Sequence, residues 1–245
     1  MDAAEIARLA RYEDWYWWHR ARRSIIQALL RHALRGADNL ILDVGAGTGA
    51  TSLALQQFGR VVAIDLSAEA TAIARDRGLA VARMDAVALA VPDATFDLVV
   101  ALDVLEHLQD DLAGAREFLR VLKPGGVLLV TVPAYAWLWS SHDVANWHWR
   151  RYRRRPLRRL LEAAGLEVEV CSYVMLSMLL PAAAYRLLER LPGRRVAEGE
   201  AEVRFTAVPP LVNSLLAHVA SWGGHLAGRV WLPFGLSIAA VARRR

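Results

Sequence analysis

A run of glycines after an apolar segment is the strongest chemical signal in the sequence. The stretch LILDVGAGTG, residues 40–49, predicts a buried strand that ends in Gly45, Gly47 and Gly49 at the start of a helix. Glycines at such a junction let the backbone turn tightly and let a ligand lie against the main chain. The spacing differs from the G-x-G-x-x-G of dinucleotide sites, and Asp43 precedes it. This carboxylate disfavours an anionic pyrophosphate and favours a ligand with a cationic amino group.

Two further carboxylates follow the next predicted strands. The run VVAID ends at Asp65, the position where sheets of this type bind the hydroxyls of a ribose. The third predicted strand ends at Met84-Asp85-Ala86, which offers a carboxylate and a backbone N–H to the edge of an adenine ring. Three acidic strand ends in register therefore predict a nucleoside-binding edge of the sheet.

Groups that could remove a proton follow the fourth and fifth predicted strands. His107 ends the stretch DVLEH, residues 103–107, and a later loop contains His142, Asp143 and His148. Both segments leave the carboxyl ends of strands, where open α/β sheets bind ligands. An imidazole or a carboxylate there can act as a general base. The alternative for each histidine is a cap or bridge within a surface loop, and the sequence does not separate His142 from His148.

The elements that must position these residues follow from hydrophobic periodicity. Between residues 39 and 131, short apolar runs alternate with amphipathic stretches of helix length. This pattern is typical of a parallel sheet that helices cover on both faces. The predicted fold class is therefore α/β, doubly wound. LEVEVCSY, residues 166–173, adds a sixth strand, and GLSIAAVA, residues 235–242, adds a seventh.

The composition argues against several classes of protein. Hydrophobic residues make up 55% of the 245 residues, enough for a large core, and the single cysteine, Cys171, cannot form an internal disulfide. The polar, acidic N-terminus lacks the pattern of a signal peptide. The apolar, uncharged run at residues 170–185 falls short of the roughly 20 residues of a membrane span. We expect a cytoplasmic protein, with peripheral contact to a membrane left open.

In their order and spacing, these motifs resemble those of the class I S-adenosylmethionine-dependent methyltransferases. The matching stretches are ILDVGAGTG, Asp65, MDA, FDLVVALDVLEHL, and LKPGG before GVLLVTVP, and the resemblance covers nearly the whole chain. It implies a Rossmann-like sheet of seven strands whose last strand is antiparallel. It also implies S-adenosyl-L-methionine as the cofactor, with its amino group near Asp43 and Gly45, its ribose at Asp65 and its adenine by Asp85 and Ala86. The full set of predicted cofactor residues is Asp43, Gly45, Ala46, Gly47, Gly49, Asp65, Leu66, Asp85, Ala86 and Leu102.

The sequence predicts one domain with four parts. These are an N-terminal helical lid (1–36), a cofactor-binding core (37–173), a helical insertion (174–233) and a final strand (234–245). Within the insertion, an apolar stripe at helical spacing predicts an amphipathic helix with a buried structural role. The stripe contains Leu211, Leu215, Val219, Trp222, Leu226 and Val230. Alternatives are that the insertion lines the acceptor pocket, pairs two subunits in a homodimer, or lies on an anionic membrane.

Methyl transfer from a sulfonium mainly requires an acceptor atom held in line, at about 3–3.5 Å from the methyl carbon. A base is needed only when the acceptor is a phenol or an alcohol. We expect a small or lipid-linked, largely apolar acceptor, with oxygen favoured as the acceptor atom. The predicted catalytic residues are His142, His148, Asp143 and His107.

The D-x-x-E-H stretch at 103–107 has a second interpretation. It predicts three side chains on one helical face. It resembles the E-x-x-E-H of the ubiquinone-pathway O-methyltransferases, where those positions bind a divalent cation, but Asp103 replaces the first glutamate. Structural packing, contact with the acceptor and metal binding all stay open, and we assign no metal ligand.

Seven of the nine tryptophans lie in two short stretches, residues 15–18 and 137–149. Tryptophans placed only for a core are normally scattered along apolar stripes, because each indole needs its own burial site. We therefore expect the two clusters to close over one apolar acceptor from opposite sides. The alternative is that the first cluster fastens the N-terminal helix to the body of the protein.

Arginine dominates the basic residues, and the net charge is +5. Seven arginines lie between Arg150 and Arg159, and we interpret them as a solvated face with partial anion contact. An RNA methyltransferase that uses this face is one alternative function. ALDV follows the fourth predicted strand in place of the N-P-P-[FY] box, which argues against nucleic acid as a partner. A subunit that binds the cofactor without turnover is another alternative.

Overall fold

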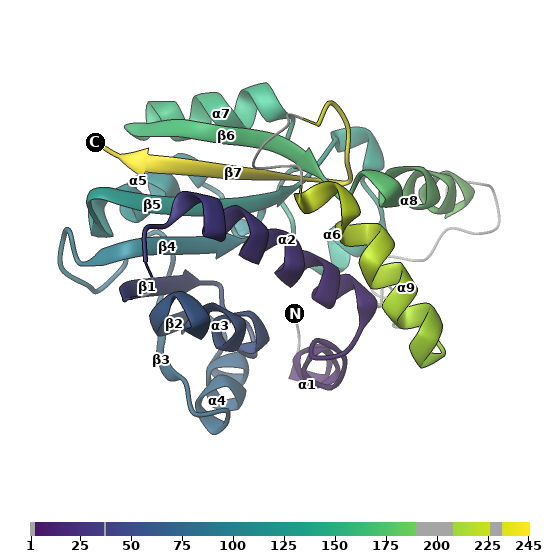
Figure 1. Cartoon of the computed structure of the whole chain (residues 1–245), viewed down its shortest axis with the longest axis horizontal. Coiled ribbons are helices and arrows are strands. Elements are labelled where there is room, and N and C mark those ends of the chain that lie inside the picture. The colour runs from purple at the N-terminus through teal and green to yellow at the C-terminus, as the bar shows by residue number, and fades with distance from the viewer. Residues whose placement is uncertain (1–2, 37, 190–207, 226–231) are drawn as a thin grey trace.

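The computed structural model describes residues 3–36, 38–189, 208–225 and 232–245. In these ranges seven strands form one sheet in the order β3-β2-β1-β4-β5-β7-β6, and helices lie on both of its faces (Figure 1). The last strand, β7, runs antiparallel to β5 and β6, and the other neighbours are parallel. The predicted fold class is therefore confirmed, including the antiparallel last strand.

The strands follow the predicted apolar runs, and the interior residues of the central strands are buried on both sides. Strands in this position read as continuous hydrophobic runs because neither face meets water. Their bounds are β1 (Asn39–Val44), β2 (Gly59–Asp65), β3 (Ala80–Arg83), β4 (Phe96–Leu102), β5 (Leu122–Pro133), β6 (Leu166–Val174) and β7 (Ser237–Arg244).

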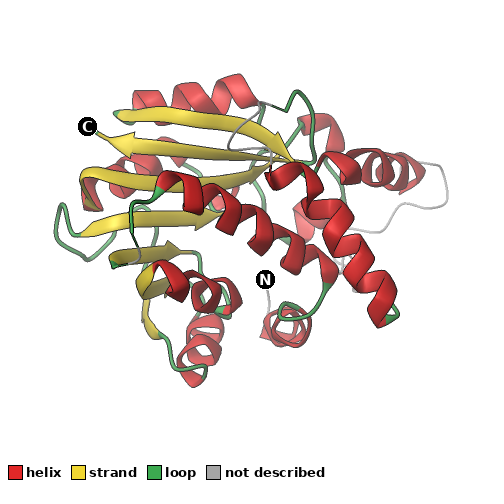
Figure 2. Cartoon of the chain, in the orientation of Figure 1, coloured by secondary structure: helices red, strands yellow, loops and turns green. Residues whose placement is uncertain are grey.

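The helices connect the strands and flank the sheet (Figure 2). They are α1 (Ala3–Tyr12), α2 (Trp17–Ala33), α3 (Ala50–Leu55), α4 (Ala68–Asp76), α5 (Asp111–Val121), α6 (Ser141–Ala145), α7 (Arg154–Ala163), α8 (Leu176–Glu189) and α9 (Pro210–Ser221). Short 3-10 turns are η1 (Gln56–Phe58), η2 (Leu105–His107), η3 (Ala136–Leu138) and η4 (Trp222–His225). Within the described ranges, no helix has the length and apolar character needed to cross a bilayer.

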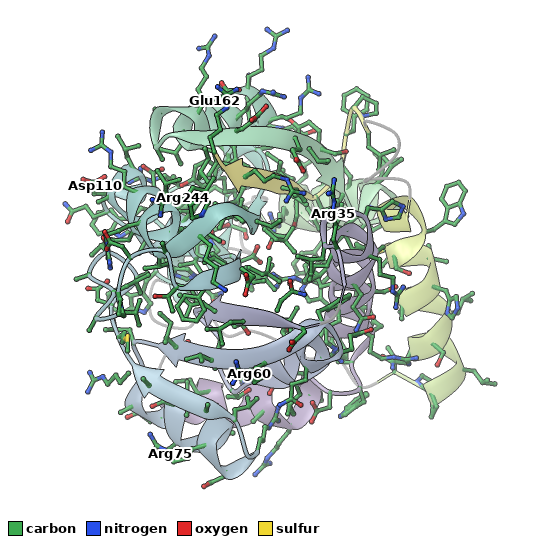
Figure 3. All side chains as sticks on the ribbon, turned by 60° about the vertical axis from the view of Figure 1, so that its left-hand side comes forward. Arg35, Arg60, Arg75, Asp110, Glu162 and Arg244 are labelled. Carbon is green, nitrogen blue, oxygen red and sulfur yellow. The ribbon has the colours of Figure 1, made fainter. Side chains whose placement is uncertain are left out.

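Two hydrophobic cores lie on the two faces of the sheet. On one face, α2 packs through residues such as Ile25 and Leu29, together with parts of α3, α8 and α9. On the other face, α5 and α7 pack through residues such as Phe118 and Leu157. Charged residues project from the outside, and Arg75 on α4 and Glu162 on α7 lie at opposite ends of the molecule (Figure 3). The predicted lid helix α2 is thus part of the main core.

The large apolar side chains of α9 face outward, whereas the sequence predicts a buried role for this stripe. On α9, Leu211 and Leu215 are 86% and 64% exposed, whereas Ala217 and Ala220 are buried. Small side chains fill the interface with α2, so the large ones point outward. The helix also ends at Ser221 and continues only as the 3-10 turn η4, which contains two glycines; glycine is a poor helix former. Leu226 and Val230 lie outside the described residues.

A buried asparagine of α9 joins the insertion to the N-terminal helices. Tyr16, the residue before α2, provides no side-chain cap for this helix. The Asn213 Oδ1 instead accepts a hydrogen bond from the Trp17 N–H at 2.7 Å, and its Nδ2 donates to the Trp15 carbonyl at 2.7 Å. Asn213 thereby satisfies two backbone groups at the turn between α1 and α2, which fixes where α2 begins.

We predict that Asn213→Ala lowers the free energy of unfolding by about 1–3 kcal/mol, because it leaves buried backbone groups without partners. Urea unfolding of both proteins measures the difference. Ser214→Ala is the matched control, since Ser214 accepts only an exposed hydrogen bond from Arg20. Equal losses for the two variants would show that the Asn213 contacts do not hold the turn.

Candidate active site

Unusual backbone conformations gather where β4, β5 and β6 end. Asp103, Tyr135 and Met175 follow β4, β5 and β6 closely, and all three have positive φ angles, between 54° and 58°. Non-glycine residues in this region are uncommon and often mark functional sites. The carboxyl edge of an open α/β sheet is also where ligands bind. The candidate site is therefore this edge.

The glycine loop wraps tightly between β1 and α3. Gly49 has φ of 93°, and a Cβ there would collide with the Leu79 side chain, so only glycine fits. Gly47 has φ of 57° and nothing within 4 Å of where its Cβ would be. The Gly47 N–H donates to Asp65 Oδ2 at 2.8 Å, which ties the loop to the end of β2. Asp65 thus holds the loop through the Gly47 N–H, while the space around the Gly47 Cα is open.

The first carboxylate of the edge, Asp43, is buried at the end of β1. It accepts a hydrogen bond from the Ser52 hydroxyl at 2.6 Å. Burial raises the pKa of Asp43 to about 7, and Asp65 adds to the shift, although the Ser52 hydrogen bond opposes it. Asp43 can therefore change its charge near neutral pH and would gain from a cationic partner.

The remaining predicted cofactor residues line the same edge. Leu66 follows β2 and is 59% exposed. Asp85 follows β3 and is exposed, with its Oδ1 accepting the Val87 N–H at 3.1 Å. Leu102 ends β4 next to β1. The structure brings the whole predicted set together along the ends of β1, β2, β3 and β4, which are neighbours in the sheet.

Sequence reasoning missed a contact between the N-terminal segment and the glycine loop. Glu13 follows α1, is 7% exposed, and accepts a hydrogen bond from the hydroxyl of the fully buried Thr48. Arg77 pairs with the same carboxylate at 2.7 Å. Burial raises the pKa of Glu13, while Thr48 and Arg77 oppose the shift. No local pattern links residue 13 to residue 48, so only the fold reveals this contact.

Asp103 does not share a helical face with Glu106 and His107, contrary to the prediction. Asp103 has a positive φ, so the backbone turns directly after β4. The 3-10 turn contains only Leu105–His107, and Asp103 lies outside it. Its carboxylate pairs with Arg22 of α2 at 2.7 Å and accepts the Thr131 hydroxyl at 2.8 Å. Asp103 therefore connects α2 to the ends of β4 and β5.

Glu106, His107 and His148 form a second cluster beside the edge. One ligand-type atom of each residue lies within 4.8 Å of the others. The rings of His107 and His148 are 4.7 Å apart and nearly perpendicular. Glu106 is fully buried, and within the described residues neither of its carboxyl oxygens has a hydrogen-bond partner. Burial, reinforced by repulsion from Asp103, raises the pKa of Glu106 well above its ordinary value.

Asp143 lies in α6 after β5 and is fully buried, so it is not a surface residue of a loop. His148 Nδ1 lies 2.9 Å from Asp143 Oδ1, and Arg151 binds both carboxylate oxygens at 2.7 and 2.9 Å. Burial by itself raises the pKa of Asp143, but the His148 and Arg151 hydrogen bonds hold it below its ordinary value. His142 is exposed, with its ring 6.3 Å from that of His148. The structure thus separates the two histidines, and only His148 joins the cluster.

Comparison with known proteins identifies the family. The model of the methyltransferase domain family matches residues 17–170. The chain belongs to the S-adenosylmethionine-dependent methyltransferases. A probable S-adenosylmethionine-dependent methyltransferase of Mycolicibacterium smegmatis is 32% identical over 213 residues, which cover 85% of this chain and 79% of that protein. The enzyme uses S-adenosyl-L-methionine as its cofactor, as the resemblance in the sequence implied.

Two relatives carry more specific names. The 2-methyl-6-phytyl-1,4-hydroquinone methyltransferase of Synechocystis is 30% identical over 204 residues, 80% of this chain and 57% of that protein. The ubiquinone biosynthesis O-methyltransferase of Xanthomonas campestris is 38% identical over 109 residues, 41% of this chain and 45% of that protein. Both matches span less than two thirds of the relative.

The solved structure of a Haloferax volcanii methyltransferase in complex with the Trm112 methyltransferase activator has the same fold. Its TM-score is 0.63 at 21% identity, over 99% of this chain and 95% of that one. At this identity the likeness supports the fold alone.

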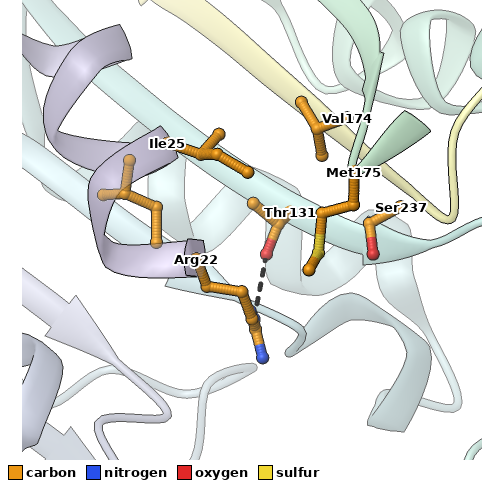
Figure 4. Close-up of a pocket in the computed structure, with 7 residues that line it drawn as sticks. Arg22, Ile25, Thr131, Val174, Met175 and Ser237 are labelled. Atoms are coloured by element: carbon orange, nitrogen blue, oxygen red, sulfur yellow. Dashed lines mark hydrogen bonds between the residues drawn. The ribbon is translucent and has the colours of Figure 1, made fainter. Parts of the chain in front are cut away.

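A small pocket of the methyltransferase lies where α2 meets the ends of β5 and β6. Its lining is mostly apolar, with Arg22 as the charged residue (Figure 4). The lining residues are Arg22, Ile25, Ile26, Thr131, Val174, Met175 and Ser237. The enclosed volume of about 10 Å³ holds no more than one water molecule. Any larger acceptor at this position requires movement of α2 or Met175.

The two tryptophan clusters of the methyltransferase differ in environment. Trp17 and Trp18, the first two residues of α2, pack against the core. This agrees with the alternative that the first cluster fastens the N-terminal helix to the body of the protein. Trp137, Trp147 and Trp149 are 45%, 76% and 60% exposed. The structure therefore does not bury the second cluster over a shared site.

The predicted solvated arginine face includes Arg151, but its side chain is only 2% exposed in its pair with Asp143. We predict that Arg151→Ala destabilises the methyltransferase by about 3–5 kcal/mol, because it removes the cation that pairs with the buried Asp143 carboxylate. Chemical unfolding measures the loss, with the exposed Arg159→Ala as control. A loss below about 1 kcal/mol for Arg151→Ala would mean that the pair is not needed for folding.

Proposed function

We propose that the methyltransferase methylates a hydroxyl oxygen of a small or lipid-linked, largely apolar acceptor. The observation that carries the proposal is the cluster of the buried Glu106 with His107 and His148, together with the mostly apolar pocket beneath α2. Arg22 and Thr131 line that pocket and hold Asp103, whose charge reaches Glu106. A hydroxyl acceptor must lose a proton during the reaction, and such a cluster is suited to that task. The names of the two relatives, one for a phytyl hydroquinone and one for ubiquinone, agree with this class.

The cofactor is proposed to lie along the ends of β1, β2 and β3. Asp43 is buried with a raised pKa, which suits contact with an ammonium group. Asp65 holds the loop through Gly47, and its position after β2 suits the ribose hydroxyls. Asp85 and Ala86 are accessible at the end of β3 for the adenine edge.

S-adenosyl-L-methionine supplies a methyl group on an excellent leaving group, so the protein mainly has to align and dehydrate the site. Glu13 seals the N-terminal segment against the glycine loop at Thr48. Arg22 brings α2 over the end of β4 through Asp103. We propose that these contacts keep water away from the reacting atoms, where alignment at about 3–3.5 Å can contribute roughly 7–11 kcal/mol to lowering the barrier. We propose that His107 or His148, whose rings lie 4.7 Å apart, receives the proton of the acceptor hydroxyl.

A first test uses acceptors and isotope-labelled S-adenosylmethionine. We predict label on the oxygen of a prenylated phenol and none on a structured RNA. The cofactor site is tested separately by calorimetry with S-adenosylhomocysteine, for which Asp65→Ala should weaken binding at least tenfold, about 1.4 kcal/mol. The exposed Asp76→Ala is the control. Label on RNA alone contradicts the proposed acceptor, and tight cofactor binding without any labelled product supports a subunit that lacks turnover.

The proposed role of Asp43 predicts a pH dependence of cofactor binding. Because its pKa is about 7 in the free enzyme, Asp43 is mostly neutral at pH 6 and mostly ionised at pH 8. Affinity for S-adenosylhomocysteine should therefore rise about tenfold across this range, since the ionised form attracts the ammonium group. Calorimetry at several pH values measures the slope. Asp43→Asn should bind more weakly and without the slope, and an unchanged slope in that variant would assign the titration to another group.

A further inference from the structure

We propose that Glu106, His107 and His148 bind a divalent transition-metal ion, of which Zn²⁺ fits best. The three residues come from two separate segments, η2 after β4 and the loop after α6. The Trp149 N–H donates to the Glu106 carbonyl at 2.8 Å, which fixes the loop against η2 and places His148 beside the other two residues. Their ligand-type atoms lie within 4.8 Å of one another, so a slight approach of the side chains would bring all three to the roughly 2.0–2.2 Å at which Zn²⁺ binds nitrogen and carboxylate oxygen.

Glu106 provides the observation that points to a ligand. It is 0% exposed, and among the residues that the structure describes, no donor reaches either carboxyl oxygen. Buried polar groups in native proteins are nearly always hydrogen-bonded, and an isolated buried carboxylate is strongly unfavourable. A cation held by the two neighbouring imidazoles would satisfy both oxygens and neutralise the charge.

His148 is prepared for such a role by its own partners. Its Nδ1 faces Asp143 Oδ1 at 2.9 Å, and a carboxylate can only accept, so Nδ1 carries the proton and Nε2 keeps its lone pair. Arg151 in turn holds Asp143 with two hydrogen bonds. A carboxylate behind a histidine is the usual second layer of a metal site, because it fixes the tautomer and the orientation of the ring.

This ligand set differs from the one that the D-x-x-E-H spacing suggests. Asp103 is occupied by Arg22 at 2.7 Å and by Thr131 at 2.8 Å, so its carboxylate already has partners. His148, about forty residues further along the chain, takes the third position. The substitution of aspartate for the first glutamate therefore changes which residues form the site.

The donor atoms decide the kind of ion. Two imidazoles and one carboxylate match the three protein ligands of open zinc sites, whereas Mg²⁺ and Ca²⁺ prefer oxygen ligands. Three protein ligands leave a position for water or for an oxygen of the acceptor. That last assignment rests on the proposed function, whereas binding of the ion itself does not.

The test measures binding of Zn²⁺ to chelator-treated enzyme by calorimetry, without any acceptor. We expect one Zn²⁺ per chain, binding at least 100-fold tighter than Mg²⁺, and a rise of the melting temperature with Zn²⁺. Glu106→Gln and His148→Ala should each weaken Zn²⁺ binding at least tenfold. Asp103→Asn should bind Zn²⁺ like the wild type, and so should His218→Ala, which removes an exposed histidine of α9.

Binding of S-adenosylhomocysteine by each variant verifies that it is folded. Failure of the wild type to bind Zn²⁺, or binding that survives His148→Ala but not Asp103→Asn, would overturn the proposal. Because no acceptor is present, neither outcome tests the methylation itself. A bound ion would take the imidazole lone pairs that the proposed function uses for proton transfer, so its presence would move that task to another group. Likewise, a negative acceptor screen leaves the result for the ion intact.

Discussion

The site depends on one constraint: carboxylates that the fold buries at the carboxyl edge of the sheet need partners that replace water. Glu13 pairs with Arg77, and Asp143 pairs with Arg151. Each pair joins segments that the sheet alone would not hold together, the N-terminal segment in the first case and the loop after β5 in the second. Among the residues that the structure describes, the Glu106 carboxyl has no such partner, which is why it carries the inference about a metal ion.

A further ion pair of this kind connects α2 to the carboxylates at the edge of the sheet. Arg22 projects from α2 to Asp103, so the position of α2 and the charge beside Glu106 are linked. Asn213 of α9 fixes the start of α2, which extends this link to the helical insertion. Because the pocket under α2 has room for only one water molecule, a larger ligand at that position would require this connected unit to shift.

The fold itself says little about the acceptor. Methyltransferases with different substrates share this sheet, and function is determined by the residues at its edge. In this chain the edge combines one half with the glycine loop and the carboxylates at the ends of β1, β2 and β3, and a second half built from η2 and the loop after β5. The second half contains Asp103 in place of a glutamate and recruits His148 from a distant segment. Differences of this kind separate members of one family.

The sequence alone determined the order and type of the strands, the glycine loop and the carboxylates at the strand ends. These features depend on rules between near neighbours: apolar periodicity, the conformational freedom of glycine and the polarity of a strand terminus. The sequence did not determine the outward stripe of α9, the burial of Arg151 or the approach of His148 to Glu106. Only the tertiary structure decided these, because a buried side chain takes whichever partner the packing of distant segments brings within hydrogen-bonding distance, and no local pattern encodes that choice.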